Sequence, residues 1–261
     1  MTPSAALASV HALWWREIIR FVRQRSRLFG AFAQPLLFWL LLGGGFSASF
    51  RPPGAPADMG ALQYFYPGII ALVLLFTAIF TTIAVVEDRQ SGFLQGVLVA
   101  PIPRASIVLG QALGGTTLAV LQGAVLLVLA PLAGIPLSIA SIAAVLFVLT
   151  AVAFALTSLS LLIAWRMDST QGFHAIMNVI LLPIWLLSGA FFPVAGAPGW
   201  LGWVMWVNPL TYGMAALRRC LYLGAPAAIG PVPPLALSLA VTLGFCVLAF
   251  GGATVVARRA A

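Results

Sequence analysis

The sequence predicts an all-α integral membrane protein with six transmembrane helices, an N-terminal amphipathic helix at the membrane surface and a re-entrant extracellular hairpin before the last span. Of its 261 residues, 62% are hydrophobic and only 7% are charged, whereas a soluble domain carries about 25% charge. Apolar stretches of the length that crosses a bilayer, about 20 residues, recur along the chain. All 13 basic residues are arginine, and they flank these stretches. A soluble globule is therefore excluded, and residues 1–261 are expected to form one transmembrane domain.

The N-terminal segment, residues 1–27, is too polar to be a span. Its arginines recur at steps of four, three and four residues, which places Arg16, Arg20, Arg23 and Arg27 on one face of a helix, with apolar residues on another. Two interpretations are open: an amphipathic helix lying at the inner membrane surface, or a simple positive-inside anchor for the next span. A cleaved signal peptide is not expected.

Six apolar stretches are expected to cross the membrane. They cover residues 28–46, 64–86, 107–129, 137–165, 173–192 and 235–257. The pair Gln34-Pro35 is expected to interrupt the first span near its start. Residues 47–63 form a polar, proline-rich loop that contains Arg51 and Asp58. Cys220 and Cys246 lie in apolar surroundings without metal-site spacing, and are expected to be packing residues.

The segment between residues 193 and 223 allows two topologies. Residues 194–207 are apolar but too short to cross a bilayer before Asn208-Pro209, and residues 210–223 form a second short helix. If neither crosses, both termini lie inside, with ten arginines inside and three outside. If residues 194–217 cross, the arginine count is again ten to three, so the positive-inside rule does not decide. Segment length favours six spans.

The scarcity of acidic residues bears on the energy source that transport could use. The five acids all lie in expected loops or at helix ends: Glu17, Asp58, Glu87, Asp88 and Asp168. Ion-coupled carriers need ionisable or coordinating groups near the midplane. Secondary active transport is therefore disfavoured.

Enzymatic chemistry finds no support in the residue patterns. His11 and His174 stand far apart in the sequence, and no cluster of metal ligands accompanies either. The chain contains no lysine, so it has no phosphate-binding loop of the GxxxxGK[ST] type. We expect no catalytic residue, no metal and no cofactor bound by this chain. The arginines flank apolar runs rather than a soluble face, so a nucleic-acid partner is not expected either.

The loop at residues 87–106 holds three adjacent charges, Glu87, Asp88 and Arg89, followed by Gly92. An amphipathic stretch at residues 93–99 then leads to Pro101 and Arg104. Such a stretch, if it forms a short helix with a proline stop, would present a rigid surface to a soluble partner. An ordinary solvated hairpin is the alternative.

These residues resemble a known family, the permease subunits of type 2 ABC exporters. The first motif is an acidic–basic–x–x–Gly pattern, an apolar stretch, Pro-x-x-Arg and a downstream glycine; it is present as Glu87, Asp88, Arg89, Gly92, Pro101, Arg104 and Gly110. The second is similar to the family's Asn-Pro-x-x-Tyr…Arg segment, and is present as Asn208, Pro209, Tyr212 and Arg218. Spacing, span number and length match end to end, and the drug-exporter and nodulation-factor-exporter branches look most similar.

The resemblance implies a dimer of this permease that binds two copies of a separate ABC ATPase. Residues 87–106 would be the coupling loop that contacts the ATPase, residues 1–27 the connecting helix, and residues 193–223 the extracellular hairpin. ATP and magnesium would bind to the ATPase, not to this chain. The implied location is the bacterial cytoplasmic (inner) membrane, where lipids surround the permease and both termini face the cytoplasm.

The substrate path would lie between two permeases. Its candidates are polar or aromatic residues of the expected spans: Gln34, Phe38, Thr77, Thr81, Gln122, Asn178, Ser188 and Phe191. Hydrogen bonding within or between helices is the usual role of such side chains. A path with so little charge suits an amphipathic drug, a lipid or a lipid-linked glycan. An ATP-independent carrier or channel for an apolar solute is the alternative function, and a structural membrane protein without transport is a third.

Overall fold

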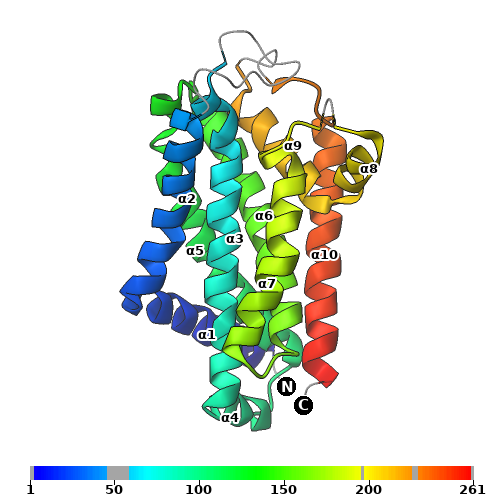
Figure 1. The fold of residues 1–261 in the computed structure, drawn as a ribbon. Helices are drawn as coiled ribbons and strands as arrows, with labels where there is room; N and C mark the ends of the chain where they lie inside the picture. Colours follow the sequence, from blue (N-terminus) through cyan, green and yellow to red (C-terminus); the bar gives the residue numbers. More distant parts are fainter. Residues whose placement is uncertain (1–2, 46–58, 195–196, 225–228, 260–261) are drawn as a thin grey trace.

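The computed structural model describes residues 3–45, 59–194, 197–224 and 229–259. All regular secondary structure in these ranges is helical (Figure 1). Arg51 and Asp58 of the expected loop lie outside the described residues, as does part of the expected hairpin, residues 195–196.

Six helices are long and apolar enough to span a membrane, which confirms the predicted number. They are α2 (Arg25–Gly45), α3 (Ala61–Gln90), α5 (Arg104–Leu127), α6 (Ile139–Ala164), α7 (Thr170–Trp185) with its π-helical continuation η2 (Leu186–Ala190), and α10 (Leu235–Arg259). The shorter elements are α1 (Pro3–Arg23), α4 (Phe93–Val99), the 3₁₀ turn η1 (Ala130–Ala133), α8 (Gly199–Val207) and α9 (Pro209–Leu221).

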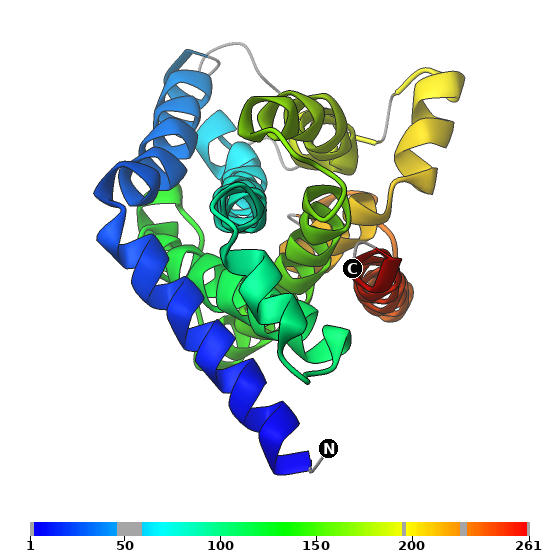
Figure 2. The same ribbon diagram turned by 90° about the horizontal axis from the view of Figure 1, so that it is seen from below.

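The central helix of the bundle is α3, which contacts α2, α5, α6 and α7 (Figure 2). Its apolar residues occur on all sides rather than along one stripe, and nearly the whole of its apolar stretch is buried. A helix that is apolar all round is stable when neighbours cover every face. Any displacement of α3 therefore reaches most of the bundle.

At the lower end of the bundle, α1 runs across the axes of the spanning helices (Figures 1 and 2). It packs closely on α5 because Gly110 and Gly114, four residues apart, present no side chain to it. A Cβ atom at Gly110 would lie 2.8 Å from Leu13 Cβ, and one at Gly114 would lie 2.6 Å from Glu17 Cβ. Small residues at this spacing let helix backbones approach.

At the opposite end, α8 and α9 lie beside the upper parts of α7 and α10 (Figure 1). They contain nine and 13 residues, too few to cross a bilayer. The six-span interpretation is thus favoured over the seven-span one. Whether the pair enters the bilayer remains a prediction.

Two features of the expected spans are corrected by the structure. Pro35 does not interrupt the first span, and α2 continues through it. If the backbone lost its helical conformation there, more of its N–H and C=O groups would have no hydrogen-bond partner inside the bilayer. The helix α3 continues to Gln90 and α5 begins at Arg104, so the connection between them is shorter than the expected loop. Glu87 and Asp88 consequently lie in the last turns of a helix.

Candidate functional site

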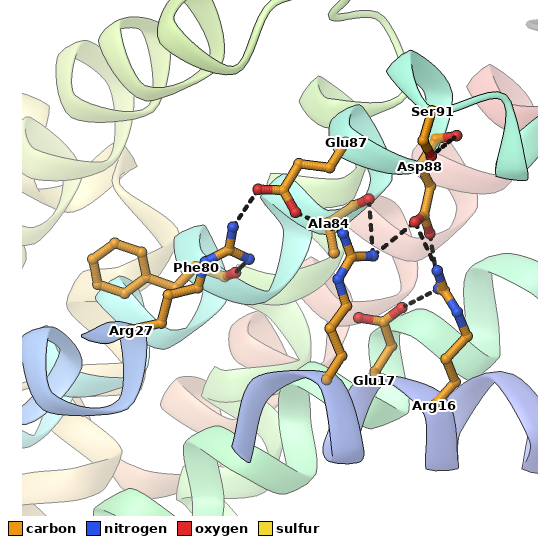
Figure 3. A network of polar contacts seen from close by, with 9 residues as sticks. Arg16, Glu17, Arg27, Phe80, Ala84, Glu87, Asp88 and Ser91 are labelled. Carbon is orange, nitrogen blue, oxygen red and sulfur yellow. Dashed lines mark hydrogen bonds and ion pairs between the residues drawn. The ribbon is translucent and has the colours of Figure 1, made fainter. Parts of the chain in front are cut away.

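A network of ion pairs joins α1 to the lower end of α3 (Figure 3). The two terminal nitrogens of the Arg16 guanidinium, Nη1 and Nη2, donate to the two carboxylate oxygens of Asp88 at 2.8 and 2.7 Å. Arg20 donates to Asp88 at 2.7 Å and to Glu87 at 2.6 Å. Arg27, at the start of α2, also donates to Glu87. Three of the four predicted connecting-helix arginines therefore bind the two predicted coupling acids, whereas Arg23 is exposed to solvent.

The sequence does not reveal this pairing, because 60 to 72 residues separate the partners. Glu87 and Asp88 were expected to face a separate protein. In the structure their carboxylates are used inside the chain, and the Asp88 side chain is 5% exposed. Bidentate arginine–carboxylate pairs fix orientation as well as adding energy. The network holds α1, α2 and α3 in one arrangement.

Glu17 lies beside this network and is almost completely buried. Burial raises the pKa of Glu17 from 4.5 to about 7, against the opposing effect of Arg16 and Arg20. Its closest ion-pair contact is Arg16, at 3.2 Å. This carboxyl group therefore titrates near neutral pH, a property that the sequence did not show.

Beyond the end of α3, the short helix α4 stands outside the bundle (Figure 1). It covers the residues for which the amphipathic pattern predicted a short helix, 93–99. Gly92 begins it with φ of +77°, a conformation that favours glycine. Leu94 packs into the core, while Val99 is 86% exposed. The Arg16 guanidinium lies 4.0 Å from the centre of the Phe93 ring, so α4 contacts α1 as well as following α3.

The remaining basic residues of this region have separate roles. Arg89 donates to the backbone carbonyls of Trp165 at 2.6 Å and Met167 at 3.1 Å, and pairs with Asp168 at 3.0 Å. It ties α3 to the turn between α6 and α7. Arg104 begins α5, and its buried Nη1 atom has no hydrogen-bond partner among the described residues. Pro101 lies in the exposed connection between α4 and α5.

The second motif is built around the end of α7, where Gly189 adopts φ of +82° and the helix stops. Asn208 caps α9 by accepting from the Leu210 amide, and donates to the Ile184 carbonyl at 2.6 Å. Arg218 donates to the Gly189 carbonyl at 2.9 Å, with its guanidinium 4.4 Å from the centre of the Tyr64 ring. The motif thus satisfies carbonyls that the end of α7 leaves without helical partners.

Pro209 and Tyr212 contribute less to this arrangement. Pro209 occupies the first turn of α9, where its missing amide hydrogen is not needed. The Tyr212 hydroxyl donates to the Trp206 carbonyl at 3.0 Å at an exposed position.

The predicted path residues divide into two groups. Thr77, Thr81, Gln122 and Ser188 are buried inside the protomer. Thr77 bonds to Gln122 at 2.6 Å, and Thr81 and Ser188 bond to carbonyls of their own helices. By contrast, Gln34, Phe38 and Asn178 are exposed, and Phe191 is half-buried. The structure does not bring these eight residues together, and their role in a path remains a prediction.

Sequence reasoning missed Gly114 and the partners of the charged residues. The signal for Gly114 was present, since Gly110 and Gly114 form a GxxxG pattern. Cys220 and Cys246 are buried and not disulfide-bonded, as expected for packing residues. Within the described ranges no three His, Cys, Asp or Glu residues are grouped so that they could hold a metal ion.

Six helices that are long and apolar enough to cross a bilayer, with a short exposed helix directly after the central one, define a multi-pass membrane protein. The model of the ABC-2 type transporter family matches residues 8–222, and the chain belongs to this family. It is therefore a transmembrane subunit of an ABC transporter, in a family of transport permeases rather than enzymes. Permeases of this family work with ABC ATPase subunits, generally as dimers.

Three relatives illustrate the breadth of the family. The chain is 30% identical over 206 residues to a putative transport permease, ycf38, of Cyanophora paradoxa, covering 78% of this chain and 70% of that protein. It is 26% identical over 219 residues to nodulation protein J of Rhizobium meliloti (strain 1021), covering 82% and 81%. It is 28% identical over 153 residues to the probable multidrug ABC transporter permease YbhR of Escherichia coli (strain K12), covering 56% and 40%.

Proposed function

We propose that this chain is the permease subunit of an ATP-driven exporter, in which two copies form the substrate pathway. Each copy is coupled to a separate ABC ATPase that binds ATP and magnesium, so that this chain itself binds no nucleotide. The proposed location is the bacterial cytoplasmic membrane, with both termini, α1 and α4 in the cytoplasm.

The link between α4 and the bundle carries this proposal. The exposed helix α4 follows the central helix α3 after one tight turn, and the ion pairs of Asp88 and Glu87 join the end of α3 to α1. A partner that moves α4 would therefore also move α3, because the connection between the two helices is short. In transporters and switches, domain movements are transmitted when packed elements of this kind change from one arrangement to another. In this proposal Glu87 and Asp88 contribute to coupling by holding the end of α3 against α1, rather than by contacting the ATPase.

The proposed substrate is an amphipathic drug, a lipid or a lipid-linked glycan. One relative is named as a probable multidrug permease and another as a nodulation protein. The exposed candidates Gln34 and Phe38 on α2 combine an amide with an aromatic ring, and the Asn178 amide on α7 is also exposed. Amides and aromatic rings suit a ligand with one polar and one apolar part.

The test uses the exposed face of α4. Val99→Asp places a charge on an 86% exposed residue, where it should not disturb folding but should abolish co-purification with the proposed ABC ATPase partner. Leu132→Asp, 78% exposed at the opposite end of the bundle, is the matched control and should leave co-purification intact. Retained co-purification in Val99→Asp would remove the coupling role of α4. Transport by this chain alone into liposomes, without ATP, would replace the exporter with an ATP-independent carrier.

A further inference from the structure

A cavity of about 560 Å³ lies at the lower end of the bundle, between α4, the turn after α6 and the last turn of α10. Figure 2 shows α4 and the end of α10 from this side. Its lining consists of Arg89, Leu94, Gln95, Leu98, Trp165, Arg166, Asp168, Val256 and Arg259.

The cavity is basic, because three arginines face one aspartate across it. Asp168 pairs with Arg89, whose guanidinium also binds two backbone carbonyls. Arg166 and Arg259 form no ion pair within the described part of the chain. Two guanidinium groups from different elements are thus available to one anion, and arginine is the residue best suited to bind a phosphate group through two nitrogens.

The inner wall of the cavity includes Trp165. The Trp165 side chain is fully buried, and its indole N–H has no hydrogen-bond acceptor among the described residues. A buried donor without an acceptor is unfavourable. Trp165 lines the cavity with its ring, while the N–H itself is closed off from solvent.

The other walls are apolar. Leu94 and Leu98 on α4 and Val256 on α10 line the cavity beside the arginines. Further up α10, Val247 and Leu248 are more than 70% exposed, as expected of side chains in contact with lipid. The cavity therefore lies where an apolar, exposed surface of α10 meets a group of basic residues.

From the two arginines without ion pairs and the apolar wall we infer that this cavity binds a phosphate group carried on an amphipathic molecule, namely the headgroup of an anionic phospholipid. Basic pockets between helices at the inner side of a membrane bind such headgroups. Because α4 forms one wall, a bound lipid would brace α4 against α10. This site is separate from the proposed ATPase contact, which uses the outer face of α4.

The test is binding of short-chain phosphatidylglycerol to the purified full-length permease, measured by native mass spectrometry. We expect one molecule per chain, and affinity that falls as salt is raised. Arg166→Gln/Arg259→Gln should weaken binding by at least about tenfold, the change expected when charge-assisted hydrogen bonds are removed. Both residues are exposed, so folding should be preserved.

Arg258→Gln is the matched control, since it removes the same charge from the same end of α10 outside the cavity. It should leave the affinity within about twofold, because a contact is lost only where side chains line the site. Inorganic phosphate distinguishes the source of the ligand: competition at equal concentration means that phosphate alone suffices, and its failure means that the lipid part is needed. Either result supports the site.

Three results would overturn the inference. They are an unchanged affinity in the double variant, an equal loss of affinity in Arg258→Gln, and binding of short-chain phosphatidylcholine that is equally tight and that the double variant does not weaken. If the double variant lost its ATPase while still binding phosphatidylglycerol, the basic cavity would be a protein-docking surface instead. The Val99→Asp experiment does not affect any of these results, so the two proposals fail separately.

Discussion

Single residues set the distance between α1 and the bundle. Gly110 was noted in the sequence only as part of a family motif, and the structure supplies its physical reason, which is close approach to α1. Gly114 has the same role one turn further along. A methyl group at either position meets atoms of α1 that belong to backbone or to the base of a side chain, and such atoms do not move aside easily.

Gly110→Ala is expected to lower the thermal denaturation midpoint of the purified protein. The new Cβ would lie 2.8 Å from Leu13 Cβ and 3.0 Å from the Val10 carbonyl oxygen, and overpacking of this kind costs about 1–3 kcal/mol. Gly244→Ala is the control, because no atom lies within 4 Å of its added Cβ; its midpoint should stay the same or rise. Equal effects of the two substitutions would contradict the close α1–α5 contact.

Glu17 gives the protein a stability that depends on pH. Because burial raises the pKa of Glu17 from 4.5 to about 7, the native state holds this proton more tightly than the unfolded state does. The contribution of Glu17 is then greatest below pH 4.5, declines as pH rises, and is lost above about pH 7. Integrated over that window, the change is on the order of 3 kcal/mol.

Glu17→Gln should remove this dependence. As the pH rises from 4.5 to about 7, the denaturation midpoint of the wild type should decrease relative to that of Glu17→Gln. Asp168→Asn, at a side chain that is 86% exposed, should leave the wild-type pH profile in place. If Glu17→Gln left the dependence of the denaturation midpoint on pH unchanged, a group other than Glu17 would be responsible for it.

Among the elements, the lower end of α3 is held in position by its ion pairs with α1. The Arg20–Asp88 contact is 2.7 Å long, and the Asp88 side chain is 5% exposed. A double-mutant cycle with Arg20→Gln and Asp88→Asn should give a coupling energy of about 1–3 kcal/mol in thermal stability. The Arg89–Asp168 pair has an exposed carboxylate, and the same cycle with Arg89→Gln and Asp168→Asn should give less than about 1 kcal/mol. Similar energies for both cycles would mean that the buried network does not brace α3.

The contact between α9 and the end of α7 is also expected to contribute to stability. Arg218→Gln removes the guanidinium that binds the Gly189 carbonyl and covers the Tyr64 ring. Hydrogen bonds to charged groups contribute about 1.5–3 kcal/mol, so the denaturation midpoint should fall clearly. Tyr212→Phe removes one exposed hydrogen bond of the same motif and should change little. A larger effect of Tyr212→Phe would mean that the tyrosine hydroxyl stabilises the α8–α9 pair more than Arg218 does.

Elements were more predictable from the sequence than contacts were. Runs of apolar residues have the length that a bilayer requires, so the six spans and the short helix α4 follow from local pattern. The partners of Glu87 and Asp88 do not, because their arginines lie 60 to 72 residues away and local periodicity says nothing of such distances. For the same reason Thr77 and Gln122 were proposed for a path, and only the fold shows that they bond to each other.

At the level of the whole molecule, the topology depends on which side α8 and α9 lie. Both occupy the end that holds η1, opposite α1 and α4 (Figure 1). A cysteine placed at Leu223, just after α9, should therefore react from the same side as one at Leu132. A cysteine at Val99 should react from the other side. These three positions are exposed, at 46%, 78% and 86%, whereas Arg218 is buried and is a poor position for labelling.

Alanine in place of the two buried native cysteines, Cys220 and Cys246, provides the background for this experiment. With a membrane-impermeant maleimide added to intact cells, we expect labelling at residues 132 and 223, and labelling at residue 99 only after permeabilisation. If residues 194–217 crossed the membrane, residue 223 would react together with residue 99, and the chain would have seven spans. If all three positions exchanged sides, the six spans would stand but α4 would face away from the cytoplasm, and no cytoplasmic ATPase could reach it. The same labelling pattern thus tests both the path of the chain and the side from which it receives energy.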